Sequence, residues 1–284
     1  MKKISLIEFD RFENNQPVNS LPTFEEFIIA ILNSLKNLGY DVNYKKNHLD
    51  SNSINLLIGS HRLFYNFENI NFKEKYFVIN LEPLDEEIYK NMNEETKIRF
   101  KRYLNFLKKS NVIDYSFLNK KIINQFHKKI EIFKFGYFNF NRNFLKNKPN
   151  NEFIFYGNCG ERRTKIFTKL IVEKKLPINI LHNIWGLFRD HEIINSLGII
   201  NIHRSSNVPL EAYRVWHSLC FGQNIISEKG SDKLLDNYFN DFITFITDPL
   251  SINNENLFNQ TKKLDFTETS FQDNLKDLIK KIEI

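Results

Sequence analysis

The chain has 284 residues, of which 42% are hydrophobic and 26% charged, as expected for a globular protein of about two domains. This composition excludes a disordered chain and a collagen-like chain. A disulfide-rich scaffold is excluded because only two cysteines, Cys159 and Cys220, are present. The basic start lacks an apolar run of signal-peptide length, and no stretch of about 18 apolar residues occurs. We therefore expect a cytoplasmic protein with reduced cysteines and no transmembrane helix.

The net charge of +6 is unevenly distributed along the sequence. Residues 1–150 carry 24 Lys and Arg against 17 Asp and Glu, whereas residues 151–284 carry 16 against 17. A basic first half favours an anionic partner, such as a membrane surface, a phosphorylated acceptor or nucleic acid. A solvated, lysine-rich surface without such a partner would give the same charge distribution.

Short apolar runs alternate with amphipathic segments throughout the first half. The runs with the length of buried strands are 2–9, 53–60, 74–82, 111–116 and 130–138. The segments with helical spacing are 23–38, 86–109 and 117–129. We expect the first of these helices to end at Gly39. Strands that alternate with helices are typical of a parallel sheet covered by helices on both faces.

A polar stretch with a proline, residues 139–151, interrupts this alternation and is the expected linker. A second series follows, with strands expected at 152–157, 177–184, 197–205, 223–228 and 241–247. Its helices are expected at 161–175, 189–196 and 209–222, with two more within 250–284. We expect a domain over 1–145, a second over 146–250, and C-terminal helices over 251–284 that pack back on the first.

The segment GNCGERR joins an expected strand to an expected helix. Gly157 and Gly160 allow the backbone to approach a phosphate closely, and the helix N-terminus offers free N–H groups. Arg162 and Arg163 add donors that suit a diphosphate. The segment matches neither the dinucleotide-binding fingerprint nor a P-loop. A strand, a glycine turn and a helix also occur together without any binding function.

A second polar segment covers residues 199–228. Glu211 is expected in the first turn of a helix, with Arg214 three residues later on the same face. A carboxylate there can accept two hydrogen bonds from a ribose diol, and the arginine can orient it or reach a phosphate. A stabilised helix end would explain the same pair. The residues of this segment that could carry chemistry are Asn201, His203, Glu211, Arg214, Ser227 and Glu228.

In their order, these segments resemble the donor half of GT-B glycosyltransferases. They resemble more narrowly a bacterial group with a strand, a glycine turn and E-R-R, followed by "LNIH…E-x-x-R…SE". The matching segments here are GNCGERR, INIHRSS, LEAYR and IISE. The first half resembles the same group in LLIGSH, INLEPL, VIDYSFLN and FKFGYF. The resemblance covers residues 54–247.

This resemblance implies two doubly wound, Rossmann-like α/β domains that face a central cleft. It also implies transfer of a sugar from a nucleotide-sugar donor to a hydroxyl acceptor, without a cofactor or a bound metal. Consistent with this, the sequence has no D-x-D triplet and no Cys or His pair at zinc spacing. Glu228 follows Glu211 by 17 residues, so the Glu-x7-Glu signature of a common retaining family is absent. We therefore expect an inverting enzyme of hexosyltransferase type.

The resemblance also implies roles for individual donor-side residues. Gly157 and Arg163 would line the diphosphate, with Arg162 beside them. The other implied roles are donor-facing for Asn201 and His203, ribose-binding for Glu211, support of that carboxylate for Arg214, and pocket closure for Ser227 and Glu228. No metal-binding residue is implied.

An inverting transfer needs a general base that takes the proton of the acceptor hydroxyl. His61 follows the expected strand 53–60, and a neutral imidazole suits this task. Glu82 ends the next expected strand and could serve as the base or orient the histidine. Asp114 is a third candidate. The alternatives are a hydrogen-bonding turn residue for His61 and a helix cap for Asp114.

The sequence thus predicts a cytoplasmic glycosyltransferase, placed at the inner membrane face if its basic first domain meets that surface. Its acceptor would be a glycan or a lipid-linked glycan. One alternative is a glycosyltransferase that acts on modified bases of viral DNA, which the basic first half favours. The other alternative is a non-catalytic partner subunit that binds a nucleotide or a glycan.

Overall fold

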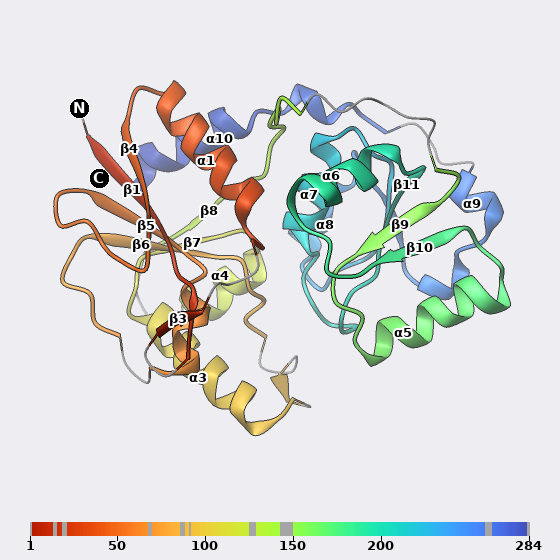
Figure 1. Cartoon of the computed structure of the whole chain (residues 1–284), viewed down its shortest axis with the longest axis horizontal. Helices are drawn as coiled ribbons and strands as arrows, with labels where there is room; N and C mark the ends of the chain where they lie inside the picture. Colours follow the sequence, from red (N-terminus) through yellow and green to blue (C-terminus); the bar gives the residue numbers. More distant parts are fainter. Residues whose placement is uncertain are drawn as a thin grey trace. The chain divides into compact units, whose positions relative to one another are not determined.

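The computed structural model describes residues 2–13, 16–18, 22–67, 70–85, 89–90, 92–124, 129–142, 150–258 and 263–282. The chain divides into two compact units, one of residues 1–135 with 270–284 and the other of residues 136–269 (Figure 1). The expected domain boundary between residues 145 and 146 lies outside the described residues. Among the described residues, no helix is long and apolar enough to cross a membrane.

The first unit is built on a six-stranded sheet in the order β4-β1-β5-β6-β7-β8, and all its strand pairs are parallel. The strands are β1 (Lys3–Glu8), β4 (Asp41–Lys46), β5 (Ile54–Ile58), β6 (Tyr76–Asn80), β7 (Val112–Asp114) and β8 (Ile130–Ile132). A small antiparallel hairpin, β2 (Arg11–Glu13) and β3 (Gln16–Val18), follows β1. Strand β4 was not predicted, because DVNYKK is a polar edge strand without an apolar run.

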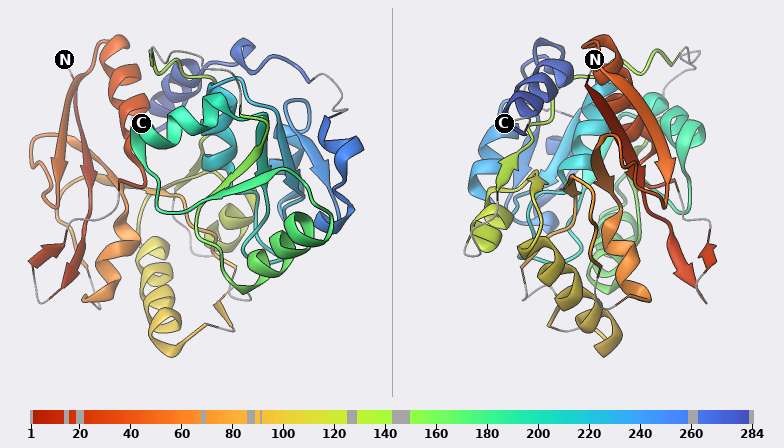
Figure 2. Two further views of the ribbon diagram at one scale, coloured as in Figure 1. Left: turned by 45° about the vertical axis from the view of Figure 1, so that its right-hand side comes forward. Right: turned by 90° about the vertical axis from the view of Figure 1, so that its left-hand side faces the viewer.

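The helices of the first unit are α1 (Glu25–Asn37), α3 (Glu94–Lys108), α4 (Phe117–Asn124) and α10 (Phe271–Ile282), with a 3₁₀ turn over Ser60–Tyr65. Helix α1 ends as predicted, because Gly39 adopts a φ of 85° that few other residues tolerate. Part of the predicted helix 86–109, residues 86–88 and 91, lies outside the described residues. Helices α1 and α10 lie side by side (Figure 2), where Asn37 donates a hydrogen bond to Gln272 over 3.2 Å.

The second unit is built on a five-stranded parallel sheet in the order β10-β9-β11-β12-β13. The strands are β9 (Phe153–Tyr156), β10 (Ile178–Leu181), β11 (Gly198–Asn201), β12 (Ile225–Glu228) and β13 (Thr244–Ile246). The helices are α5 (Glu161–Thr168), which continues as a π-helical turn to Glu173, α6 (Gly186–Asn195), α7 (Ala212–Cys220), α8 (Lys233–Phe239) and α9 (Asn254–Phe258). The apolar runs of β9, β11 and β12 are buried along their length, as is typical of parallel strands covered on both faces.

Both sheets place their first strand between the second and the third in chain order. The direction of winding therefore reverses between β1 and β5 in the first unit and between β9 and β11 in the second. In sheets of this kind, ligands bind beyond the carboxyl ends of the strands at this reversal, the topological switch point. The residues that follow these four strands are thus the first candidates for function.

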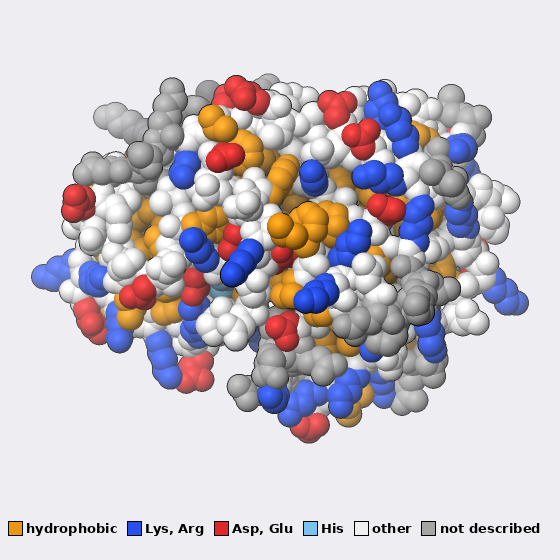
Figure 3. Space-filling view, turned by 180° about the vertical axis from the view of Figure 1, so that it is seen from behind, with side chains coloured by type: hydrophobic (Ala, Val, Ile, Leu, Met, Phe, Trp, Pro, Cys, Tyr) orange, Lys and Arg blue, Asp and Glu red, His pale blue; other side chains and the backbone are white. Residues whose placement is uncertain are grey.

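The described surface mixes charges of both signs. On the face drawn in Figure 3, Lys and Arg side chains are spread among Asp and Glu side chains. Among the side chains coloured in this view, positive charges are therefore interleaved with negative ones, although the first half of the sequence carries the excess of positive charge.

Candidate functional site

The switch point of the second sheet brings together the turn after β9 and the end of β11. These strands are adjacent and parallel, with Ile154 opposite Ile199, so both chains emerge at the same edge. Gly157 follows β9 with a φ of 130°, and a Cβ atom there would lie 2.6 Å from the Nη2 atom of Arg214. Glycine is therefore required at this position for two reasons: its backbone conformation and the close approach of the Arg214 guanidinium.

Glu211 lies between two arginines at the start of α7. It is the N-cap residue of this helix, one position before the predicted first turn. One carboxylate oxygen accepts a hydrogen bond from Arg163 and the other accepts one from Arg214. Burial would raise the pKa of Glu211, but Arg214 and Arg163 outweigh it and hold that pKa below its usual range. The carboxylate is therefore charged at neutral pH.

Arg163 ties three segments of the second unit together. Its Nε atom donates to the carbonyl of Ile202 over 2.8 Å, and its Nη1 atom donates to the carbonyl of Asn158 over 2.7 Å. Its Nη2 atom donates to Glu211, and the side chain is buried. All three guanidinium nitrogens are thus engaged by the protein itself, and the turn after β9 is fixed against the end of β11.

Arg214 extends this network toward β12. Its Nη1 atom donates to the side-chain oxygen of Asn201 over 2.8 Å as well as to Glu211. The amide of Asn201 in turn donates to the hydroxyl of Ser227 over 2.9 Å. The carboxyl ends of β11 and β12 are therefore joined by side chains as well as by the sheet.

Arg162 and Glu228 form a second ion pair beside the first. The Nη1 atom of Arg162 donates to Glu228 over 2.9 Å, and its Nη2 atom donates to the other carboxylate oxygen. The same Nη1 atom donates to the carbonyl of His203 over 2.8 Å, while the backbone N–H of His203 donates to Glu228 over 3.1 Å. The backbone of His203 is thus held on both sides.

The imidazole of His203 differs from its neighbours. The residue is completely buried, and neither ring nitrogen has a hydrogen-bond partner among the described residues. Burial lowers the pKa of His203 below its usual value, although Glu211 and Glu228 act in the opposite direction. The ring is therefore neutral at pH 7, with one donor and one acceptor nitrogen available.

The structure places all nine predicted donor-side residues at this edge of the second sheet. They form one connected set that contains three arginines and two glutamates, a net charge of +1. These residues are Gly157, Arg162, Arg163, Asn201, His203, Glu211, Arg214, Ser227 and Glu228.

In the first unit, His61 lies at the carboxyl end of β5 and faces Glu82. Gly59, with a φ of 71°, turns the chain after β5, and the Nε2 atom of His61 lies 3.6 Å from a carboxylate oxygen of Glu82. The His61 side chain is 26% exposed. Burial lowers the pKa of His61, Glu82 opposes this, and Arg62 and Arg99 add to the lowering. The imidazole is therefore neutral at pH 7 and able to accept a proton.

Asp114 is enclosed by hydrogen-bond donors at the end of β7. It accepts bonds from Asn80 over 2.8 Å, from Asn119 over 3.1 Å and from the backbone N–H of Ser116 over 2.8 Å. Asn80 and Asn119 both also donate to the carbonyl of Glu82, over 2.8 and 2.9 Å. Burial outweighs these donors and raises the pKa of Asp114 to about 7. Its contacts therefore hold the segment that carries Glu82.

A further polar group lies at the switch point of the first sheet and was not predicted from the sequence. Glu8, which ends β1, accepts hydrogen bonds from Arg62 over 3.3 Å and from the hydroxyl of Tyr44 over 2.5 Å. Asp10 and Asn47 exchange two hydrogen bonds of 2.8 and 3.0 Å. The available signal was the acidic end of the first predicted strand, KISLIEFD, beside a switch point that only the strand order reveals.

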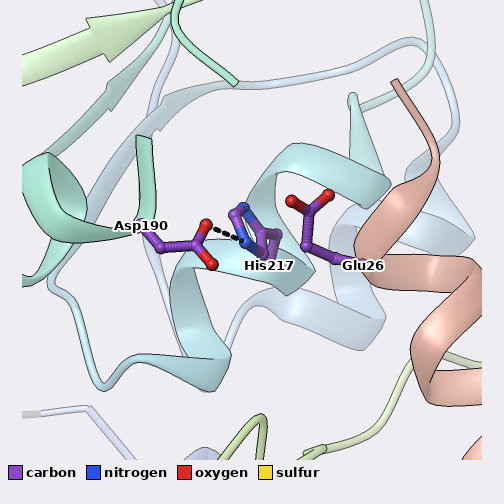
Figure 4. A group of neighbouring side chains, drawn as sticks. All are labelled: Glu26, Asp190 and His217. Atoms are coloured by element: carbon purple, nitrogen blue, oxygen red, sulfur yellow. Dashed lines mark ion pairs between the residues drawn. The ribbon is translucent and has the colours of Figure 1, made fainter. Parts of the chain in front are cut away.

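A buried contact between Asp190 of α6 and His217 of α7 was also not predicted. The Nε2 atom of His217 lies 3.0 Å from Asp190 (Figure 4), and the Nε atom of Arg142 lies 3.2 Å from the other carboxylate oxygen of Asp190. Asp190 and His217 are 27 residues apart in sequence, so no local pattern could have indicated their contact.

Comparison with known proteins rests on structure alone. No protein-family model matches the sequence, and no curated protein matches it either. Among solved structures, one of Anabaena Alr3699/HepE in complex with UDP and glucose has a TM-score of 0.55 at 10% identity, covering 98% of this chain and 99% of that one. AviGT4, a glycosyltransferase involved in avilamycin A biosynthesis, has a TM-score of 0.57 at 7% identity, covering 98% and 91%.

A third structure, T4 phage BGT in complex with UDP and Mn²⁺, has a TM-score of 0.51 at 13% identity, covering 98% of this chain and 96% of that one. At these identities the likeness establishes the fold. The chain has the GT-B fold, with two Rossmann-like units, as the sequence resemblance implied.

Substitution of Gly157 by alanine should disrupt the Glu211 network, because the new Cβ atom would meet the Arg214 guanidinium and the backbone would be strained. We expect a loss of about 1–3 kcal/mol in the free energy of unfolding, measured by urea denaturation. Gly160→Ala is the matched control, because no atom lies within 4 Å of its Cβ position. Equal effects of the two substitutions would contradict the packing described for Gly157.

Asp114 should make stability depend on pH between about 4 and 7. Its pKa is raised to about 7 in the folded protein, so in this range the folded state holds a proton that the unfolded chain releases. The free energy of unfolding should therefore fall as pH rises, by up to about 4 kcal/mol from this group. Asp114→Asn should flatten the slope in urea denaturation across pH 4–8. Asp277→Asn, at an exposed position, should keep the original slope, and parallel curves for all three proteins would refute this assignment.

Proposed function

We propose that the chain is a glycosyltransferase that moves a sugar from a nucleotide-sugar donor, bound by the second unit, to a hydroxyl group of a glycan or lipid-linked glycan. The observation that carries this proposal is the connected polar network around Glu211, located at the switch point of a GT-B fold. The structure of the Anabaena neighbour is a complex with UDP and glucose, which supports the substrate class.

Each part of the donor would meet a different part of this network. Glu211 keeps lone pairs beyond those used by Arg163 and Arg214, and its side chain is 27% exposed, so it can accept hydrogen bonds from the ribose hydroxyls. The phosphates would meet the N-terminus of α5, whose N-cap Gly160 provides no side-chain cap. Asn201, Ser227 and Glu228 would hold the pocket in shape from β11 and β12.

We further propose that the transfer proceeds without a bound metal and with inversion. The acceptor oxygen would attack the anomeric carbon while the bond from that carbon to the diphosphate oxygen breaks, and the nucleoside diphosphate would leave. The positive end of α5 and the net charge of +1 around Glu211 support the departure of this anion.

His61 would take the proton of the acceptor hydroxyl in this reaction. Its Nε2 atom faces Glu82, so the Nδ1 atom is the one available to the acceptor. Glu82 would stabilise the imidazolium that forms. Asp114, Asn80 and Asn119 would act through Glu82 as positioning residues, because they fix the backbone of its segment.

The excess of positive charge in residues 1–150 supports an anionic acceptor or membrane surface on the acceptor side, in the cytoplasm. The same charge favours a second candidate acceptor, a modified base in DNA. Phosphate contacts weaken as salt rises, so binding to duplex DNA that falls steeply between about 50 and 200 mM salt would favour that acceptor. Salt-independent binding, or none, would remove it.

The donor assignment is tested by thermal denaturation in the presence of UDP, GDP, ADP, TDP and CMP and their common sugars at fixed salt. We expect one nucleotide to raise the melting temperature. Glu211→Gln should abolish this shift, because the amide cannot hold both arginines and the ribose. Glu161→Gln, a side chain that is 82% exposed at the start of α5, should keep it. If no nucleotide stabilises the protein, the proposed function fails.

The base assignment is tested by sugar transfer once the donor is known. His61→Ala should lower kcat by about 10²–10⁴ and leave the nucleotide affinity unchanged. Because the pKa of His61 lies below its usual value, activity should persist as pH falls to about 6.5 and decline only below it. A variant with unchanged kcat would show that another group takes the proton. Nucleotide binding without any transfer would favour a non-catalytic subunit.

A further inference from the structure

The arginines near the proposed phosphate position are already engaged by carboxylates and carbonyls. Arg163 uses all three of its nitrogens on protein acceptors, and Arg162 uses both of its Nη atoms on Glu228. If Arg162 turned to a ligand, the buried carboxylate of Glu228 would lose its arginine partner, and if Arg163 turned to a ligand, Glu211 would keep only Arg214. The loss of such a partner is unfavourable for a buried charge. These arginines are therefore better suited to hold the site in shape than to bind phosphate.

His203 has the opposite arrangement at the same place. Its backbone N–H and carbonyl are fixed by Glu228 and Arg162, yet neither ring nitrogen has a hydrogen-bond partner among the described residues. Buried polar groups are nearly always hydrogen-bonded in folded proteins. The imidazole of His203 is completely buried and held in position by its backbone, so its two ring nitrogens are suited to hydrogen-bond a ligand.

The location of this ring points to the chemistry of that ligand. Arg163 bridges the carbonyls of Asn158 and Ile202, so the turn after β9 lies directly beside His203. This turn leads into the N-terminus of α5, which attracts anions. The surrounding three arginines and two glutamates leave a net charge of +1, which also favours an anion.

We infer that the imidazole of His203 donates a hydrogen bond to the phosphate chain of the donor nucleotide, and that Arg162 and Arg163 support the site without contacting the phosphates. This inference rests on the proposed function. It assigns His203 to the leaving group of the transfer reaction rather than to the base, the ribose or the sugar. The ring is neutral at pH 7, so it contributes a donor without adding a charge.

The test compares a nucleoside with its phosphates on the full-length protein. Calorimetric titrations with uridine, UMP and UDP, and in parallel with the adenosine and guanosine series, give the gain in affinity from the phosphates. We expect wild type to bind one diphosphate more tightly than its nucleoside. His203→Ala should weaken that diphosphate about tenfold to a hundredfold and leave the nucleoside unchanged. His182→Ala, at an exposed position of the same unit, should match wild type.

Two amide variants show whether a hydrogen bond or only a filled volume is needed. The amide of His203→Gln can replace an N–H at Nε2, and the amide of His203→Asn can replace one at Nδ1. We expect one of the two to recover most of the diphosphate affinity. If the alanine variant does not fold, these variants and the ring ¹⁵N signals of the unmodified protein decide, because one His203 N–H signal should move when UDP or the preferred diphosphate binds.

The outcomes separate this inference from the proposed function. Equal weakening of nucleoside and diphosphate in His203→Ala, or no weakening, would overturn the inference and leave the donor site intact. A wild-type protein that binds nucleoside and diphosphate equally would do the same. A wild-type protein that binds no nucleotide would overturn both.

Discussion

The carboxylate of Glu211 is the interaction on which the second unit's site depends. It joins Arg163, which holds the turn after β9 against Ile202, to Arg214, which reaches Asn201 on β11. Removing either arginine would leave this carboxylate with one cationic partner instead of two, and removing the carboxylate would leave two cations 51 residues apart in sequence facing each other. The turn, the end of β11 and the start of α7 are therefore fixed by one group.

The polar residues of this site therefore have two different roles. The arginines that head α5 are bound to carboxylates, so they maintain the geometry of the switch point, and His203 keeps its ring nitrogens available. The first unit shows the same arrangement in a different form. There the buried Asp114 holds Asn80 and Asn119, and these hold the segment of Glu82, which faces His61. A buried carboxyl group in the first unit and a partly exposed carboxylate in the second thus position residues that remain free to react or bind.

The sequence predicted those parts of the fold that local patterns determine. Apolar runs such as FIFY and GIIN become buried parallel strands, because both faces of the sheet are covered. Strand β4 was not predicted because an edge strand needs no apolar run. The short helix α8 was not predicted because its seven residues are too few for a clear helical pattern. The candidate residues were found from strand ends and glycine turns. The ion pairs among these residues could not be predicted. Arg162 binds Glu228 and Arg163 binds Glu211 only because the strand order places their segments next to each other.

We propose above all that the switch point of the second sheet binds the nucleotide of the donor. Hydrogen exchange measured by mass spectrometry, with and without the nucleoside diphosphate that stabilises the protein most, tests it directly. We expect slower exchange in the turn after β9, at Ile202 and His203, and at the start of α7, with exchange in the outer strands β10 and β13 unchanged. Slower exchange confined to the first unit, or spread evenly over the chain, would contradict it.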